Sequence, residues 1–154
     1  GGGNSALDAA LQLVNIASKV YLVNIAKRLS GDEIMRQKVE AHRLVEVLNN
    51  AQVVAVTGER FVNGLKVKKE GRDVFLDVEG VFVEIGLLPN SEFAQGLEKN
   101  IAGEIKVNCR NETNIAGIFA AGDVTDVPEK QIIVAAGEGA KAVLGVFRYL
   151  SGLR

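Results

Sequence analysis

The chain has 154 residues, 47% of them hydrophobic and 24% charged, which is the composition of a globular protein with room for one domain or two small lobes. A net charge of −1 argues against a nucleic-acid-binding surface, and no apolar run reaches the roughly 18 to 20 residues that span a bilayer. A single cysteine excludes a disulfide framework and a C-x-x-C pair within the chain. We therefore expect a protein of the cytoplasm that binds neither nucleic acid nor membrane.

The first third of the chain predicts a helix, a buried strand and a second helix. Apolar residues recur every three or four positions over residues 5–17, which is the period of an amphipathic helix. Residues 20–23 are apolar throughout, as in a parallel strand that is covered on both faces. Ser30 and Glu33 have the spacing of a capping box and predict a helix over residues 32–41.

The middle of the chain is rich in short β-branched segments. Strands are expected at residues 45–48, 52–56, 61–68, 73–78 and 80–85. A hairpin turn is expected at residues 69–72. The basic residues around this turn are interpreted as a solvated surface; they are Lys66, Lys68, Lys69 and Arg72.

The last part of the chain opens on a break at residues 86–90 (Gly-Leu-Leu-Pro-Asn), a candidate boundary between lobes. Two further strands are expected at residues 104–107 and 117–120. A final helix is expected over residues 130–150. Small residues along its first half would let it lie close to a sheet or to a ligand.

The first six residues, Gly-Gly-Gly-Asn-Ser-Ala, fit the dinucleotide-binding pattern G-x-G-x-x-A. In that pattern the glycines permit a tight turn and a close approach of the pyrophosphate to the backbone. The amides at the start of the following helix then face the phosphates. The position about 20 residues on, which contacts the ribose, falls at Val23 and Asn24. A glycine-rich end left by cloning is the alternative.

A second motif spans residues 113–124, where an apolar segment ends in Ala-Ala-Gly-Asp. The small residues would let a bulky ligand lie against the end of the strand. Asp123 would accept hydrogen bonds from ligand hydroxyls. An ordinary strand that ends in a Gly-Asp turn is an equally good interpretation of this stretch alone.

Four segments together resemble the pyridine nucleotide–disulfide oxidoreductases, in order and with compatible spacing; they are residues 1–6, 86–90, 117–126 and 130–142. The resemblance covers essentially the whole chain. It is nearest to the branch that contains the thioredoxin reductases and the flavoprotein subunit of alkyl hydroperoxide reductase. The phrases at residues 86–90, 112–114 and 130–133 favour the latter.

The resemblance implies an α/β fold with two partial domains. Residues 1–83 would be a Rossmann-like NAD(P)-binding domain that lacks its first strand, and residues 84–154 the C-terminal segment of an FAD-binding domain. Hydride would pass from the nicotinamide to FAD and on to a protein disulfide, with a thioredoxin-like or peroxiredoxin partner. A non-catalytic nucleotide-binding or scaffold fragment is the alternative.

The resemblance also implies two sets of cofactor contacts. The pyrophosphate turn of the nicotinamide cofactor would comprise Gly1, Gly3, Asn4, Ser5 and Ala6. The flavin contacts would comprise Gly122, Asp123, Lys130, Gln131 and Ile132. We expect no metal site.

Selectivity between NADH and NADPH is expected to favour NADH. Thioredoxin reductases that use NADPH carry a His-Arg-Arg cluster and a further arginine after the second strand. The matching positions here are Asn24, Ile25, Ala26 and Ser30, which offer no guanidinium to a 2′-phosphate. Lys27 and Arg28 lie nearby but off the pattern, and Asn24 would bind a ribose hydroxyl.

Two family features are not in the sequence: the FAD fingerprint G-x-G-x-x-G and the redox C-x-x-C. Cys109 is interpreted as a small residue at a strand end, and His42 as a surface or capping residue. No residue is a candidate acid, base or nucleophile, so disulfide reduction by this chain alone is not expected. The segment 117–120 and the final helix should expose an apolar patch. Such a patch predicts a homodimer or association with a missing N-terminal half.

Overall fold

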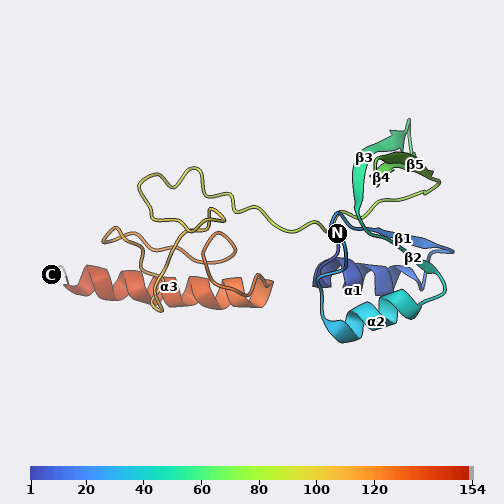
Figure 1. The fold of residues 1–154 in the computed structure, drawn as a ribbon. Coiled ribbons are helices and arrows are strands. Elements are labelled where there is room, and N and C mark those ends of the chain that lie inside the picture. Colours follow the sequence, from blue (N-terminus) through green and yellow to red (C-terminus); the bar gives the residue numbers. More distant parts are fainter. Residues whose placement is uncertain (153–154) are drawn as a thin grey trace. The chain divides into compact units, whose positions relative to one another are not determined.

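The computed structural model describes residues 1–152, shown as a ribbon in Figure 1. The chain separates into two compact units, Gly1–Gly86 and a second that begins at Leu87. This division falls within the break expected at residues 86–90, whereas the domain boundary implied by the family resemblance followed residue 83. The assignment of these units to a nicotinamide domain and a flavin domain stays a prediction.

The first unit begins with two helices and a pair of parallel strands. In chain order they are α1 (Asn4–Leu13), β1 (Val20–Val23), α2 (Glu33–Ala41) and β2 (Val45–Leu48). Val20 of β1 lies opposite Val45 of β2. Both helices lie on one side of the strand pair (Figure 1), where Leu7, Leu29 and Val39 are buried. The first helix is shorter than expected, because the chain turns after Leu13.

β1 divides its side chains between two apolar clusters. Val20 and Leu22 join the cluster under the helices, whereas Tyr21 and Val23 pack against a second cluster. That second cluster contains Leu65 and other residues of an antiparallel sheet. The apolar run at residues 20–23 therefore forms a strand with apolar contacts on both faces, as the sequence predicted.

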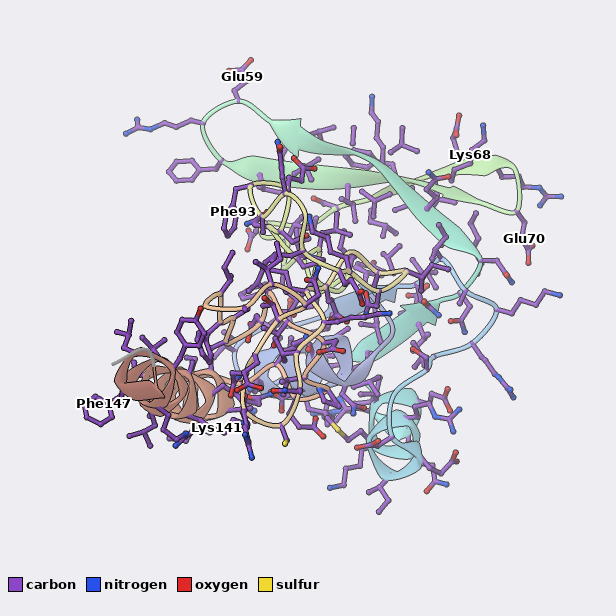
Figure 2. All side chains as sticks on the ribbon, turned by 90° about the vertical axis from the view of Figure 1, so that its left-hand side faces the viewer. Glu59, Lys68, Glu70, Phe93, Lys141 and Phe147 are labelled. Carbon is purple, nitrogen blue, oxygen red and sulfur yellow. The ribbon has the colours of Figure 1, made fainter. Side chains whose placement is uncertain are left out.

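The antiparallel sheet has the order β3-β4-β5, with β3 (Ala51–Gly58), β4 (Val62–Lys69) and β5 (Arg72–Leu76). Glu70 and Gly71 both have positive φ, 51° and 81°, as a two-residue hairpin turn requires. Lys68 and Glu70 project outward at this end of the sheet, and Glu59 does so at the opposite turn (Figure 2). This arrangement agrees with the interpretation of the basic residues as a solvated surface.

The start of α2 corrects the predicted capping box. Asp32 is the N-cap, and no side chain caps the helix. Ser30 lies two residues too early, and its hydroxyl donates instead to the Gly2 carbonyl at 3.4 Å. Glu33 accepts from Arg36 and from Gln37 within the helix. The capping box fails because the loop before α2 is held by the glycine turn.

Three expected strands do not form as regular strands. Residues 80–85 form no strand, and residues 104–107 and 117–120 make only isolated bridges, Ile105 with Thr125 and Glu112 with Phe119 among them. Within residues 87–152 no strand offers a continuous row of partners. A β-branched segment without such a row cannot become a strand, whatever its propensity.

The second unit ends in the long helix α3 (Ile132–Gly152). Gly145 lets Phe119 approach, because a Cβ there would lie 2.7 Å from the ring. Phe119 also meets Tyr149 edge to face, with 6.3 Å between the ring centroids. Away from this contact, α3 exposes large apolar side chains, namely Ile133, Val143, Leu144, Phe147 and Leu150. Phe147 projects away from the helix in Figure 2.

Candidate functional sites

The glycine turn before α1 uses its three glycines in two different ways. A Cβ on Gly1 would lie 1.7 Å from the Glu84 carbonyl oxygen, and one on Gly2 would lie 2.6 Å from Asn24 Oδ1. A Cβ on Gly3 would have no neighbour nearer than 3.9 Å. The protein's own packing therefore requires the first two glycines, whereas Gly3 borders open space at the start of α1.

The N-terminus of α1 has the features of an anion site. Gly3 is its N-cap, so no side chain caps the helix, and its first turn carries no acidic residue. The first amides of a helix have no partner within the helix, and the helix dipole favours a negative charge there. These amides belong to Asn4, Ser5 and Ala6. The Asn4 side chain itself accepts from the Asp32 amide at 2.7 Å, and the Ala6 side chain is buried in the core.

This turn opens on a cleft of about 560 Å³. The cleft is lined by the glycine turn and the start of α1, by the end of β1 with the residues that follow it, by the start of β3 and by residues 84–86. Glu84 is the only Asp, Glu, Lys or Arg among the lining residues. All of them belong to the first unit. The cleft therefore joins the glycine motif to the position that would contact the ribose.

Asn24 lies in this cleft, but its side chain is engaged by the protein. It is 5% exposed, and its Nδ2 donates to Asn49 Oδ1 at 2.8 Å and to the Ala26 carbonyl at 3.3 Å. Its Oδ1 accepts from the Ala26 amide at 3.3 Å. These contacts shape the turn that follows β1. A contact with a ribose hydroxyl stays a prediction.

A second cleft, of about 300 Å³, contains two of the residues expected to contact flavin, Asp123 and Lys130. Its other lining residues are Leu87, Leu88, Pro89, Asn90, Glu104 and Val124. Asp123 is exposed and follows Gly122, whose φ of 81° requires glycine. Thr125 closes this turn, because its hydroxyl donates to the Gly122 carbonyl at 2.7 Å.

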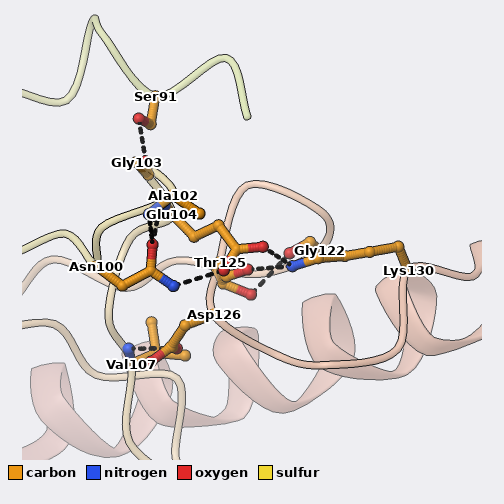
Figure 3. A network of polar contacts seen from close by, with 10 residues as sticks. All are labelled: Ser91, Asn100, Ala102, Gly103, Glu104, Val107, Gly122, Thr125, Asp126 and Lys130. Atoms are coloured by element: carbon orange, nitrogen blue, oxygen red, sulfur yellow. Dashed lines mark hydrogen bonds and ion pairs between the residues drawn. The ribbon is translucent and has the colours of Figure 1, made fainter. Parts of the chain in front are cut away.

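Lys130 points back into the second unit (Figure 3). Its Nζ lies 2.8 Å from Glu104 Oε1 and donates to the Thr125 carbonyl at 2.5 Å. Asn100 Nδ2 donates to the other oxygen of Glu104 at 2.6 Å. The hydrogen bond from Lys130, followed by that from Asn100, lowers the pKa of Glu104 below its ordinary value.

The remaining predicted flavin contacts lie at the start of α3. The Gln131 carbonyl accepts from the Ala135 amide at 2.9 Å, while the Ile132 side chain is 92% exposed. The helix does bring these two residues to the same end as Lys130. Gly137 and Gly139 have no neighbour within 4 Å of an added Cβ, so these two glycines of α3 border open space.

Sequence reasoning missed the polar residues that hold these loops. Glu104 and Thr125 both bind Lys130, and Asn111 is fully buried. Asn111 Nδ2 donates to the Ala120 carbonyl at 3.0 Å and to Glu138 Oε2 on α3. The only available signal in the sequence for such a buried polar contact was a charged or amide residue that interrupts an apolar segment.

The other residues singled out in the sequence take minor places. Cys109 is exposed. His42 caps the end of α2, and its Nδ1 accepts from the Leu44 amide at 3.2 Å. Residues 1–152 contain no group of three His, Cys, Asp or Glu side chains that could hold a metal ion. Across the same residues, no helix is both long and apolar enough to cross a membrane.

The glycine turn before α1, the parallel strand pair and the helices beside it are features of a dinucleotide-binding α/β protein. The chain belongs to the family described as pyridine nucleotide-disulphide oxidoreductase, which matches residues 1–139. It is 43% identical over 154 residues to a subunit of the alkyl hydroperoxide reductase of Escherichia coli (strain K12), covering 97% of this chain and 30% of that protein. It is 41% identical to a protein of Bacillus subtilis (strain 168) named NADH dehydrogenase, with the same coverage.

Solved structures agree with this membership. The thioredoxin reductase of Lactococcus lactis superposes with a TM-score of 0.81 at 28% identity, covering 98% of this chain and 51% of that one. That of T. acidophilum has a TM-score of 0.79 at 31% identity, with 100% and 51% covered. The fold is thus that of the nucleotide-binding domains of these reductases. The chain spans about 30% of the curated relatives and about half of the solved chains.

Proposed function

We propose that this chain forms the nicotinamide-nucleotide site and one side of the flavin site of an NAD(P)H-dependent flavoprotein disulfide reductase. Gly1–Gly86 would be the nicotinamide unit, and the unit from Leu87 the returning part of the flavin domain. The observation that carries the proposal is the uncapped start of α1 at Gly3, which opens on a cleft. Family membership supports it.

The chain offers hydrogen-bonding groups that suit each of the two cofactors. Backbone amides at Asn4 and Ser5 suit a pyrophosphate, because they offer hydrogen bonds and a favourable dipole. Asp123 offers an exposed carboxylate that would accept from flavin hydroxyls. When bound, the cofactors supply hydride transfer. The chain's own residues would bind and orient them, and no residue here is assigned an acid or base role.

We propose NADH as the preferred nucleotide. The cleft at Gly3 is lined by no Lys or Arg, and Glu84 would repel a 2′-phosphate. A relative named NADH dehydrogenase agrees with this preference. The electron acceptor would be the disulfide of a peroxiredoxin or thioredoxin partner, as the names of the relatives suggest. Because the chain holds a single cysteine, it would need thiols from elsewhere to reduce a disulfide.

Titration of the purified chain with NADH, NADPH and FAD tests the proposal, and the variant G3D sharpens it. Gly3 has an extended backbone and free space at its Cβ, so Asp is tolerated there. Its carboxylate would cap α1 and occupy the amides that a pyrophosphate needs. We expect NADH binding to be lost while the fold is kept.

The matched control is G3A, which adds a Cβ without a carboxylate; it leaves the first amides of α1 uncapped and should weaken NADH binding less than G3D does. A folded wild-type chain that binds neither NADH nor FAD would contradict the proposed function. So would a G3D variant that binds NADH as tightly as the wild type does.

We further propose that the exposed apolar face of α3 is covered by association, either with a second copy or with the missing part of a flavin domain. Large exposed apolar patches usually mark interaction sites. Multi-angle light scattering of the purified chain is expected to show a species larger than the monomer. A monomer at all concentrations would exclude the second copy as the occupant.

A further inference from the structure

Two walls of the second cleft are connected by one polar network (Figure 3). Ser91, next to the wall formed by residues 87–90, donates its hydroxyl to the Gly103 carbonyl at 2.5 Å. Asn100 Oδ1 accepts from the Ala102 amide at 2.9 Å and from the Glu104 amide at 3.0 Å. Glu104 then meets Lys130. The network thus runs from one wall of the cleft to Lys130, which lies two residues before the start of α3.

We propose that Glu104 and Lys130 act as a pair of positioning residues that hold the turn around Asp123 in the geometry a flavin requires. This inference rests on the flavin site proposed above. It changes the role that the family resemblance implies for Lys130, from a direct contact with the cofactor to a contact with the turn.

The donors of Lys130 favour this role. An ammonium group has three donors, and two are taken here by Glu104 Oε1 and by the Thr125 carbonyl. The side chains of Glu104 and Lys130 are each only 21% exposed. A lysine held in this way presents little free charge to the cleft, so Asp123 is left as the exposed charged group on this turn.

The turn itself is tied to the segment that carries Glu104. The Ile105 amide donates to the Val124 carbonyl at 2.9 Å, and the Asp126 amide donates to the Ile105 carbonyl at 3.0 Å. Asp126 Oδ1 also accepts from the Val107 amide at 3.0 Å. The residues that follow Asp123 are therefore held by the segment of Ile105 and Val107. Glu104, which precedes Ile105, adds a further connection through Lys130 to the Thr125 carbonyl.

Lys130 is the charged partner of the Glu104 carboxylate, and the neutral Asn100 amide donates to its other oxygen. Asp123 lines the same cleft, Asp126 Oδ1 accepts from the Val107 amide, and Lys99 Nζ donates to the Ser91 carbonyl. Protonation of Glu104 removes the anion that attracts Lys130. If the pair positions the turn, flavin affinity will fall as Glu104 is protonated.

The test compares E104Q, K130M, the double variant and K130R in the whole chain. Flavin affinity is measured by fluorescence quenching from pH 8 down to below pH 4, because the lowered pKa of Glu104 places its protonation on the acid side of the ordinary value. Amide exchange at Thr125 and Asp126 is measured by mass spectrometry. The control is K141M, which breaks the Lys141–Glu138 pair within α3, at 2.9 Å, away from the cleft.

We expect E104Q and K130M each to weaken flavin binding by roughly three- to tenfold and to speed exchange at the turn. The double variant should be no weaker than K130M, because the pair acts as a unit. K130R should retain affinity, and K141M should match the wild type. E104Q should also lose the acid-side fall in affinity that Glu104 causes.

Two results would overturn the inference. One is E104Q binding flavin as tightly as the wild type, or more tightly, while K130M is impaired; Lys130 would then contact the cofactor directly. The other is unchanged exchange at Thr125 and Asp126 in both variants. A wild-type chain that binds no flavin would instead overturn the proposed function, and the exchange measurement would still decide whether the pair holds the turn.

Discussion

The two units build their sites from different materials. In Gly1–Gly86, regular helices and strands enclose two apolar clusters, and the site consists of backbone groups at the start of α1. In the second unit, Ile105 is the only buried hydrophobic residue among those the structure describes, and side-chain hydrogen bonds shape the loops. A site made of backbone amides depends on an apolar core that holds the helix in place. A site made of loops depends on buried polar groups that have hydrogen-bond partners.

The largest expected effect concerns the apolar core of the first unit. L7A removes a side chain with no exposure between α1 and β1. We expect a loss of about 2–5 kcal/mol in the free energy of unfolding, because the transfer term and the cavity term add. The chain holds two tyrosines, Tyr21 in the first unit and Tyr149 in the second. In a Y149F chain the remaining Tyr21 fluorescence reports the first unit, and in a Y21F chain Tyr149 reports the second. Urea melts with and without L7A in each of these two chains would show which unit is destabilised. A shift confined to the Tyr149 signal would contradict the comparison.

The second effect concerns the polar interior of the other unit. N111A removes the donor to the Ala120 carbonyl and to Glu138, and it places alanine at a φ of 63°. We expect a loss of about 2–3 kcal/mol, since Asn111 is fully buried and its two partly buried partners lose their donor. N111G is the control, because glycine adopts this φ without strain. If N111G were as stable as the wild type, strain rather than hydrogen bonding would explain the loss.

The third effect is an acid-side pH dependence of the second unit. The pKa of Glu104 is lowered by Lys130 and Asn100. A carboxyl whose pKa is lower in the folded state contributes stability that is present above its unfolded pKa of about 4.3. That stability is lost as the pH falls through the folded pKa. Thermal melts of E104Q should show a weaker acid destabilisation of the Tyr149 signal, and an unchanged acid profile would contradict the assignment.

The smallest effect is expected at the surface of the first unit. Lys19 lies 2.6 Å from Glu46, but both side chains are about half exposed, at 49% and 47%. Exposed pairs of this kind contribute little, because water screens them and the side chains lose freedom. K19M should leave the urea midpoint of the Tyr21 signal unchanged within error. A clear loss would mean that surface charge supports this unit as much as its apolar core does.

The sequence predicted the first unit better than the second, for a physical reason. The helix and strand periods over residues 5–23 and the hairpin at residues 69–72 are local signals, and the structure follows them. Both depend on near neighbours in the chain. The strands expected at residues 104–107 and 117–120 depended on distant partners, and within the described residues those segments have only isolated bridges.

The candidate sites divide in the same way. The glycine turn and the Gly-Asp turn were visible in the sequence, because small residues and positive φ leave a local signature. The engagement of Asn24 and the contact of Lys130 with Glu104 were not visible, because each joins segments about 25 residues apart. Only the tertiary structure decides such contacts.

By itself, then, the sequence determined the family, the α/β class and the two turns at which cofactors are expected. The tertiary structure decided that Gly3 faces the cleft, that the Asn24 side chain binds Asn49 and that Lys130 pairs with Glu104. Local backbone preferences are encoded by neighbouring residues, but the use of a polar side chain depends on what the fold brings within hydrogen-bonding distance.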